Sequence, residues 1–488
     1  MIRTFGLFTL VFLLAGCPSN ITNEGPPPER LYFPSGLAHV DVPGKTEGVL
    51  FVANANSDKR YSTGSVVALP LDSIGLPAIG APLAVSASGT SYVRQITDLK
   101  LEASQNVQIA SFAGELAVQT TGPGAYRLYV PTRSEGMRAY QVLANVSADG
   151  VPSLSCNAGE PSQNCTDVGT TLTPKTFNGI DAGIQWPLTP FGVTAAPRAC
   201  TVDTDCCLAG TTCGRSCATG QCLGTDGQPY ADVWMTYAPR TDANTLLNGR
   251  GLTGYLARLD SDDFTFKAEN LVAIGSGGAN SIVAWGSWVY VTGRILSPSP
   301  NLLRIVNKDQ VVYSTGLESL FRVSDSRGVT ISSDGKRLFM VGRVPDTLMV
   351  ASITETGGVP ALSFVRGIEL CDAPNEARAI ARPGRGDLVA ITCTSSGAVA
   401  IYDEDVGDLV ALVSGIGAQP FDLAVDTRAN AARIYVSMFG DGRIAVIDVP
   451  DLNRPQGARL VAHLGAQQVC LTRGKTSPGC LASKEVTQ

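Results

Sequence analysis

Short apolar segments separated by turn residues recur along the chain from about residue 31 onward. The clearest unit predicts three strands, at 419–426, 433–437 and 440–448, the last of which opens on a Gly-Asp-Gly turn. Apolar runs of this length between turn residues are typical of strands buried on both faces. Long amphipathic helical patterns are hard to find, and the many Gly and Pro residues suit short strands joined by turns. The pattern predicts an all-β protein.

Similar units can be followed along most of the sequence, which indicates an internal repeat. A second clear copy spans 327–341 and places the turn Ser333-Asp334-Gly335-Lys336 between two strands. Less regular copies lie at 49–71, 127–142, 233–259, 281–306 and 377–402. Together they make about seven units spaced roughly 60 residues apart, since insertions lengthen several of them.

The units at 419–448 and 327–341 resemble the YVTN-type repeat of β-propeller proteins. The resemblance implies a β-propeller over residues 31–465, with about seven blades that are each a four-stranded antiparallel sheet. A closed ring of sheets leaves only short, protected edge strands, which favours it over an open arrangement. A pair of β-sandwiches and an eight-bladed ring are the alternatives.

The N-terminus has the pattern of an export signal. Residues 1–16 contain one basic residue followed by about ten apolar residues, too few to span a bilayer. Leu14-Ala15-Gly16-Cys17 resembles the lipobox of bacterial lipoproteins, which implies cleavage before Cys17, lipidation of Cys17 and a stable membrane anchor. Pro18, where inner-membrane lipoproteins usually carry Asp, implies an outer-membrane lipoprotein facing the periplasm or the cell surface. Residues 17–30 then predict a flexible tether. An ordinary secretory signal with a chance cysteine is the alternative.

The cysteines also indicate an exported chain. The sequence contains 13 of them, and setting Cys17 aside leaves an even number in short-range groups, which predicts disulfides. The predicted pairs are Cys156 with Cys165, Cys371 with Cys393, and Cys470 with Cys480, the last closing a tail at 466–488. The remaining disulfide residues form an insert at 200–222: Cys200, Cys206, Cys207, Cys213, Cys217 and Cys222.

Zinc is the alternative for this insert, and it is disfavoured. The cysteine spacings lack a C-x2-C pair, and the two histidines of the chain, His39 and His463, lie far away in sequence. Asp203 and Asp205 are only a weak indication of a calcium-binding site. We therefore predict no metal site.

Charge and motifs narrow the classes of function. The formal net charge of −6 and the absence of basic blocks argue against a nucleic-acid partner. The chain has no G-x-S-x-G, H-E-x-x-H or P-loop motif, and two distant histidines offer little for catalysis. The sequence thus predicts no cofactor and favours a non-catalytic protein over an enzyme.

Arginines recur at one position of the repeat, directly after the second strand. In a propeller these loops share a face, so their guanidinium groups could bind carboxylate or phosphate there, and two more arginines begin first strands. The candidate ligand-binding residues are Arg133, Arg240, Arg294 and Arg343, with Arg327 and Arg378. Local pairing with Glu135, Asp242 and Asp346, fixing hairpins only, is the alternative.

These patterns together predict a membrane-anchored propeller that acts as a binding or scaffold module. Its expected partner is an envelope protein or an anionic envelope polymer, and the membrane is contacted through the lipid anchor. A propeller-type hydrolase or oxidoreductase acting on an envelope or environmental substrate is the alternative function. Fold alone does not decide between them.

Overall fold

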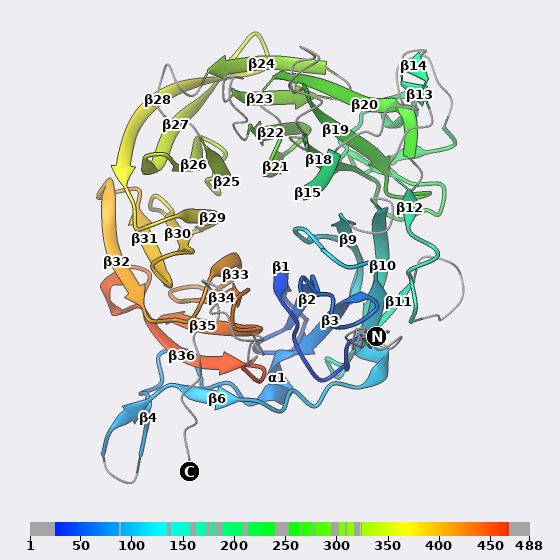
Figure 1. Cartoon of the computed structure of the whole chain (residues 1–488). Helices are drawn as coiled ribbons and strands as arrows, with labels where there is room; N and C mark the ends of the chain where they lie inside the picture. Colours follow the sequence, from blue (N-terminus) through cyan, green and yellow to red (C-terminus); the bar gives the residue numbers. More distant parts are fainter. Residues whose placement is uncertain are drawn as a thin grey trace, which may run out of the picture.

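The computed structural model describes residues 25–86, 89–133, 138–156, 163–171, 176–177, 180–181, 188–207, 213–239, 253–264, 266–276, 279–293, 302–307, 310–316, 323 and 325–467. Figure 1 shows these residues forming a ring of sheets around a central axis, in chain order. Within the described part of the chain, seven four-stranded antiparallel sheets make up the blades. The predicted seven-bladed propeller is confirmed, and the alternatives of two β-sandwiches and of eight blades are excluded.

The blades are numbered here along the chain, and their strands run from the axis outward. Blade one contains β1 (Pro34–Val40), β2 (Val49–Asn54), β3 (Gly64–Pro70) and β7 (Asn106–Ile109). Blade two contains β8 (Ala117–Gly122), β9 (Ala125–Thr132), β10 (Arg138–Val146) and β11 (Pro152–Cys156). Blade three contains β15 (Leu188–Pro197), β18 (Ala231–Pro239), β19 (Thr253–Asp260) and β20 (Phe266–Ser276).

Blades four to seven complete the ring. They contain β21 (Ile282–Trp285), β22 (Trp288–Thr292), β23 (Leu302–Asn307) and β24 (Gln310–Gly316); β25 (Ser326–Ile331), β26 (Arg337–Arg343), β27 (Asp346–Thr356) and β28 (Val359–Glu369); β29 (Pro374–Ile380), β30 (Leu388–Cys393), β31 (Ala398–Asp403) and β32 (Asp408–Ser414); and β33 (Pro420–Thr427), β34 (Ala432–Met438), β35 (Arg443–Val449) and β36 (Arg459–Leu464).

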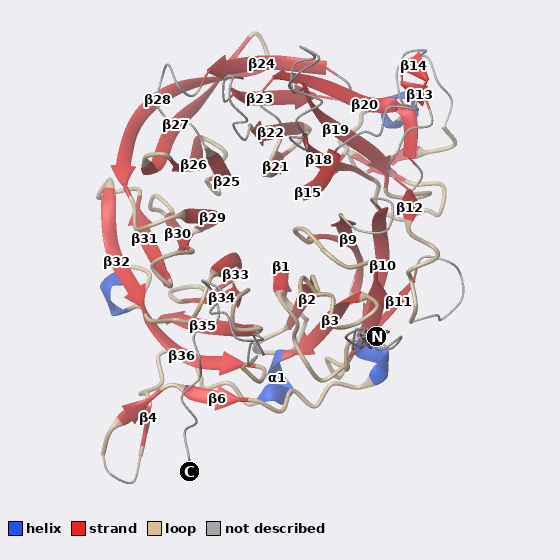
Figure 2. Cartoon of the chain, viewed as in Figure 1, coloured by secondary structure: helices blue, strands red, loops and turns tan. Residues whose placement is uncertain are grey.

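Helix is scarce among the described residues, as Figure 2 shows. The short elements outside the four-stranded pattern are α1 (Leu71–Ile74), the 3-10 turns η1 (Ala103–Gln105), η2 (Asp203–Cys206) and η3 (Pro455–Gly457), and the strands β4 (Ala84–Val85), β5 (Ser91–Tyr92), β6 (Arg94–Ile96), β12 (Thr170–Thr171), β13 (Thr176–Phe177), β14 (Ile180–Asp181), β16 (Ser216–Ala218) and β17 (Gln221–Leu223).

Burial explains the apolar runs in the sequence. Every residue of the middle strands β2 and β30 is buried, because neighbouring blades cover both faces of each sheet. The outer strand β28 is exposed at five consecutive positions before Ile368. A strand between two covered faces shows an unbroken apolar run, whereas an outer strand does not need one.

Both ends of the described chain meet at the contact between blades one and seven. The backbone N–H of Leu37 donates to Asp422 at 2.8 Å, and Arg433 forms a buried ion pair with Glu47 at 2.6 Å. β6, from the long connection between β3 and β7, pairs in parallel with β36 and adds a fifth strand to the last blade (Figure 1). The ring is therefore closed by backbone pairing as well as by side chains.

Five of the seven inner strands begin with a local irregularity that turns a residue toward the axis. In five blades the pairing register shifts at this point, between Pro34/Gly36, Pro190/Val193, Ser326/Val329, Pro374/Ala377 and Pro420/Leu423. Such bulges commonly re-aim a side chain. A Cβ on Gly328 would lie 2.7 Å from the Cα of Glu376 in the next blade, so the inner strands are in close contact here. We call this end of the ring the axial mouth.

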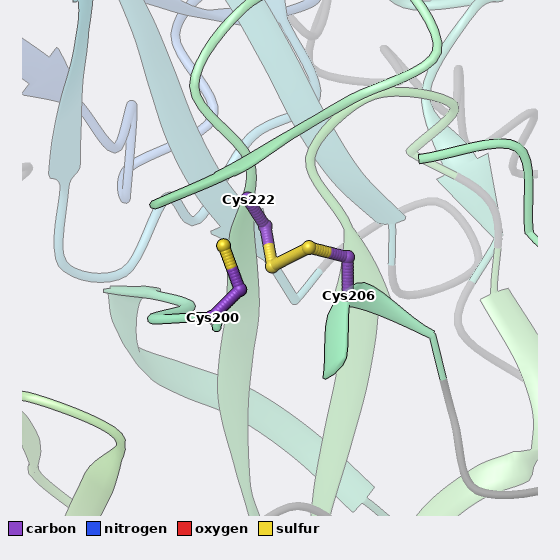
Figure 3. A group of neighbouring side chains, drawn as sticks. All are labelled: Cys200, Cys206 and Cys222. Atoms are coloured by element: carbon purple, nitrogen blue, oxygen red, sulfur yellow. A yellow bond between two sulfur atoms is a disulfide. The ribbon is translucent and has the colours of Figure 1, made fainter. Parts of the chain in front are cut away.

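Five disulfides are present in the described residues. They join Cys156 to Cys165, Cys371 to Cys393, Cys200 to Cys217, Cys206 to Cys222 and Cys207 to Cys213. Figure 3 shows the bond between Cys206 and Cys222, with Cys200 beside it. Sulfur atoms in disulfides have no thiolate charge to offer a metal, so the pairing leaves no zinc ligands among these cysteines. Cys17, Cys470 and Cys480 lie outside the described residues.

The disulfide-rich insert is attached to the third blade at the end of β15 remote from the axial mouth. Arg215 of the insert donates to both carboxylate oxygens of Asp262, at 2.9 and 3.0 Å, and its guanidinium lies 3.9 Å from the ring centroid of Tyr230. Asp203 accepts from the backbone N–H of Cys217, and Asp205 accepts from that of Thr201. These two carboxylates hold the backbone of the insert together.

Candidate functional site

A pocket of about 150 Å³ opens at the axial mouth. Six of its ten lining residues lie at the five bulges, so the repeat itself builds much of the site. The lining residues are Ser35, Ala113, Arg133, Phe191, Asn280, Arg327, Asn375, Glu376, Phe421 and Phe439. They belong to all seven blades, which makes the pocket a property of the closed ring.

Phenylalanine rings form one side of the pocket. The ring centroids of Phe191 and Phe421 are 5.9 Å apart, and those of Phe421 and Phe439 are 5.5 Å apart. Phe33 continues the row, 5.2 Å from Phe439. The Arg133 guanidinium lies 5.6 Å from the centroid of Phe191, within the range of a cation–π contact. The mouth therefore offers apolar surface next to positive charge.

The structure places four of the six candidate arginines at this end of the axis. Arg133 and Arg327 line the pocket, and Arg327 is paired with Asp325 at 2.8 Å. Arg343 donates to the carbonyl oxygen of Pro374 at 2.8 Å and to Asn375 at 2.9 Å. Arg378 follows Glu376 on the inner strand β29. Arg240 and Arg294 lie outside the described residues.

Of the three acidic residues expected to pair locally with these arginines, only Asp346 lies among the described residues. Asp346 accepts a hydrogen bond from the backbone N–H of Ala373. Glu135 and Asp242 lie outside the described residues. Arg378 instead pairs with Glu376 at 2.5 Å and with Asp422 at 3.3 Å, across two blades.

Three carboxyl groups are buried beside the pocket: Glu115 just before β8, Glu376 in β29 and Asp422 in β33. Glu115, Glu376 and Asp422 are 5%, 3% and 2% exposed. Glu115 Oε2 accepts from the N–H of Val193 at 3.4 Å, whereas its Oε1 has no hydrogen-bond partner among the described residues. We call these groups and Arg378 the axial charge cluster.

Burial dominates the electrostatics of the axial charge cluster. It raises the pKa of Glu376 to about 7, against the attraction of Arg378 and with the repulsion of Asp422. Burial and the neighbouring charges of Glu376 and Asp422 also raise the pKa of Glu115 well above its usual value. In a buried site, ionising all three carboxyl groups around one guanidinium is energetically unfavourable. The cluster therefore retains a proton near neutral pH.

Neither histidine lines the pocket. His463 donates from Nε2 to the carbonyl oxygen of Ile416 at 2.8 Å, and its Nδ1 lies 3.1 Å from the Gln95 amide. Burial lowers the pKa of His463, so it is a neutral, fully bonded structural residue. His39 lies on the contact between blades one and seven. The described pocket lining thus contains no Ser-His-Asp arrangement.

Sequence reasoning missed the phenylalanines, asparagines and carboxylates of the mouth. A signal was present, because Pro190-Phe191-Gly192-Val193 and Pro420-Phe421-Asp422-Leu423 share one pattern at the start of an inner strand. The residue before the glycine or aspartate of this pattern is the one that enters the pocket. The bulge breaks the regular alternation of the strand, so the sequence alone could not show that this side chain points into the pocket.

The size of the pocket limits what it can hold. A cavity of about 150 Å³ takes a group the size of benzene. Sites for cofactors and drug-sized molecules usually measure about 300–1,000 Å³. The pocket can therefore accept one or two side chains or a single small group.

Comparison with known proteins adds little to this geometry. No family model matches the chain, and no curated protein matches it. Among solved structures, it is similar to Kuenenia stuttgartiensis hydrazine synthase, with 12% identity, coverage of 86% of this chain and 96% of that chain, and a TM-score of 0.48. It is also similar to a provisionally assigned 6-phosphogluconolactonase from Bacteroides uniformis, with 15% identity, coverage of 77% and 83%, and a TM-score of 0.39. The Dos1 propeller shares 11% identity, with coverage of 83% and 92% and a TM-score of 0.39.

None of the helices that the structure describes is long and apolar enough to cross a membrane.

Proposed function

We propose that the chain is a lipid-anchored β-propeller of the bacterial outer membrane that binds an acidic segment of an envelope protein at the axial mouth. The lipobox-like sequence ending at Cys17 supports the anchor, and the disulfides support an oxidising compartment. The ring then acts as a rigid platform held near the membrane by the residues that follow Cys17.

The observation that carries the binding role is the composition of the pocket. Phe191, Phe421 and Phe439 give an apolar wall, and Arg133 and Arg327 add positive charge at its edge. Aromatic residues and arginine are the types most enriched at protein interfaces. A protein segment with an apolar and an acidic side chain matches both parts, and its side chains fit the small volume.

A crosslinking experiment tests this function in the cells that make the protein. A photoreactive amino acid at Asn280 lies in the mouth, and one at Arg385, in the turn between β29 and β30 at the other end of the axis, is the matched control. We expect one protein adduct from position 280 and none from 385. Arg133→Glu should lower the adduct yield roughly 10- to 100-fold, the scale of one charge-assisted hydrogen bond.

Other outcomes of the same experiment would contradict the proposal. Equal adducts at both positions, or none at 280, would exclude the mouth as a specific protein site. A polysaccharide adduct at 280 would identify an anionic envelope polymer as the partner instead. The melting temperature of Arg133→Glu serves as the check on folding.

A hydrolase is the second candidate, and Glu376 is the observation that favours it. A carboxyl with a pKa of about 7 that lines a pocket is suited to general acid–base catalysis. The binding function explains more of the lining, because the phenylalanines and arginines take no part in such a reaction. Turnover of an ester or lactone panel that is abolished in Glu376→Gln would favour the hydrolase.

A further inference from the structure

The contact between blades one and seven brings together three side chains that could bind a metal. His39 lies in β1, Asp41 follows that strand directly, and Asp426 lies in β33. One potential ligand atom from each lies within 4.8 Å of the others. The three come from opposite ends of the chain, so this group exists only in the closed ring.

His39 is held in the orientation that metal-binding histidines usually have. Its Nε2 contacts the backbone carbonyl oxygen of Glu47 at 2.8 Å, and this nitrogen must donate because a carbonyl only accepts. In the neutral ring with this tautomer, Nδ1 carries the lone pair. The ring also stacks on Tyr435, with centroids 5.7 Å apart and planes 16° apart. Histidine ligands commonly donate their other N–H to a carbonyl in this way.

Both aspartates keep oxygen atoms available. Asp426 is buried and accepts from Arg428 through Oδ2 only, at 2.7 and 3.1 Å, which leaves Oδ1. The exposed side chain of Asp41 has no hydrogen bond or ion pair to a residue that the structure describes. Two carboxylate oxygens and one imidazole nitrogen are therefore available at one place.

The surrounding charges favour a cation. Glu47 pairs with Arg428 at 3.0 Å and with Arg433 at 2.6 Å, and Arg433 also pairs with Asp448 at 2.8 Å. Together with Asp41 and Asp426, four carboxylates and two guanidinium groups lie around the imidazole of His39. The four carboxylates exceed the two guanidinium groups by two negative charges, which matches the charge of a divalent ion.

The imidazole and carboxylate ligands favour Zn²⁺ over Ca²⁺. An imidazole with two carboxylates suits Zn²⁺, with water in the remaining position, whereas Ca²⁺ needs six to eight oxygen ligands. Ligands about 2.0–2.2 Å from a tetrahedral ion lie about 3.3 Å apart. The potential ligand atoms of the three residues already lie within 4.8 Å of one another, and the side chain of Asp41 is exposed.

We propose that His39, Asp41 and Asp426 bind one Zn²⁺ ion and that this ion ties the first blade to the last. The site is separate from the axial mouth, since β1 and β33 begin at the mouth and these residues lie near the other ends of the two strands. Zn²⁺ binding would then stabilise the ring closure, at the point where the two ends of the folded chain meet.

The test uses the mature chain without a polyhistidine tag, stripped with EDTA. We expect calorimetry to show one Zn²⁺ per chain and thermal unfolding to shift upward with Zn²⁺ but not with Ca²⁺. Asp41→Asn should weaken Zn²⁺ binding at least tenfold and leave the melting temperature of the metal-free protein unchanged, because Asp41 is exposed. His463→Gln, which alters the only other histidine, is the matched control and should bind as the wild type does.

Several results would overturn the proposal. Equal Zn²⁺ affinity in the wild type and Asp41→Asn would place the ion elsewhere, as would a loss of binding in His463→Gln. Absence of a Zn²⁺-dependent shift at millimolar metal would exclude the site altogether. Co²⁺ provides a second measurement, since its visible absorption should be lost in both Asp41→Asn and His39→Gln.

Discussion

The axial charge cluster should make the stability of the protein fall as the pH rises from about 4.5 to about 7. Glu376 is buried and ion-paired with Arg378, yet burial raises its pKa from 4.5 to about 7. The perturbation we consider is Glu376→Gln, which keeps the size of the side chain and an acceptor for the N–H of Ala377 but cannot ionise.

The sign and the size follow from proton linkage. Between about pH 4.5 and 7 the folded protein retains a proton on this carboxyl that the unfolded chain has lost, so the free energy of unfolding decreases with rising pH. The stabilisation is fully present below about pH 4.5 and is lost by about pH 7. At about 1.36 kcal/mol per pH unit, the whole effect is on the order of 3 kcal/mol.

The measurement is urea unfolding of the wild type and Glu376→Gln at pH 5 and pH 8. We expect the wild type to lose about 2–3 kcal/mol more than the variant over this interval. The exposed Glu369→Gln in β28 is the control and should follow the wild type. Parallel curves for the wild type and Glu376→Gln would refute the reasoning, because they would show that ionising this carboxyl inside the ring carries no penalty.

Three further changes test the anchor, the insert and the inner strands. Cys17→Ser should move the chain from the membrane pellet to the soluble fraction on immunoblots, and an unchanged distribution would contradict lipidation. Replacing Cys206 and Cys222 by Ala opens a link with a sequence separation of 16 and should cost about 3 kcal/mol in urea unfolding. Gly328→Ala puts a Cβ 2.7 Å from the backbone of β29 and should destabilise by about 1–3 kcal/mol, whereas Gly457→Ala, with open space around it, should be neutral.

The blade architecture could be predicted from the sequence because the middle strands carry unbroken apolar runs. The units at 327–341 and 419–448 each coincide with the first strands of one blade. β6 could not be predicted, since Arg94-Gln95-Ile96 is too short to carry a pattern and its partner strand is distant in sequence. The pairing within the insert was also open, because six cysteines allow 15 arrangements.

The candidate site was predictable only where one blade repeats another. Arg133 and Arg343 could be assigned to one face because both lie at the end of a second strand, Arg133 directly after β9 and Arg343 as the last residue of β26. The contact between Glu115, Glu376 and Asp422 depends on how three blades meet at the axis, which no local pattern reports. The same limit applies to His39 and Asp426, whose strands are neighbours only after the ring has closed.

The carboxylates of the axial charge cluster are not required by the propeller itself. At the position of Glu115, Glu376 and Asp422, the other inner strands carry Gly36, Gly192, Ser281 and Gly328, and those blades form the same sheets. Small residues therefore satisfy the packing at the axis. Buried charged groups usually lower stability relative to well-packed apolar or small residues, so a purely structural ring would have no use for them. Because they lie beside the pocket, they are candidates for a role at the mouth rather than in the packing of the ring.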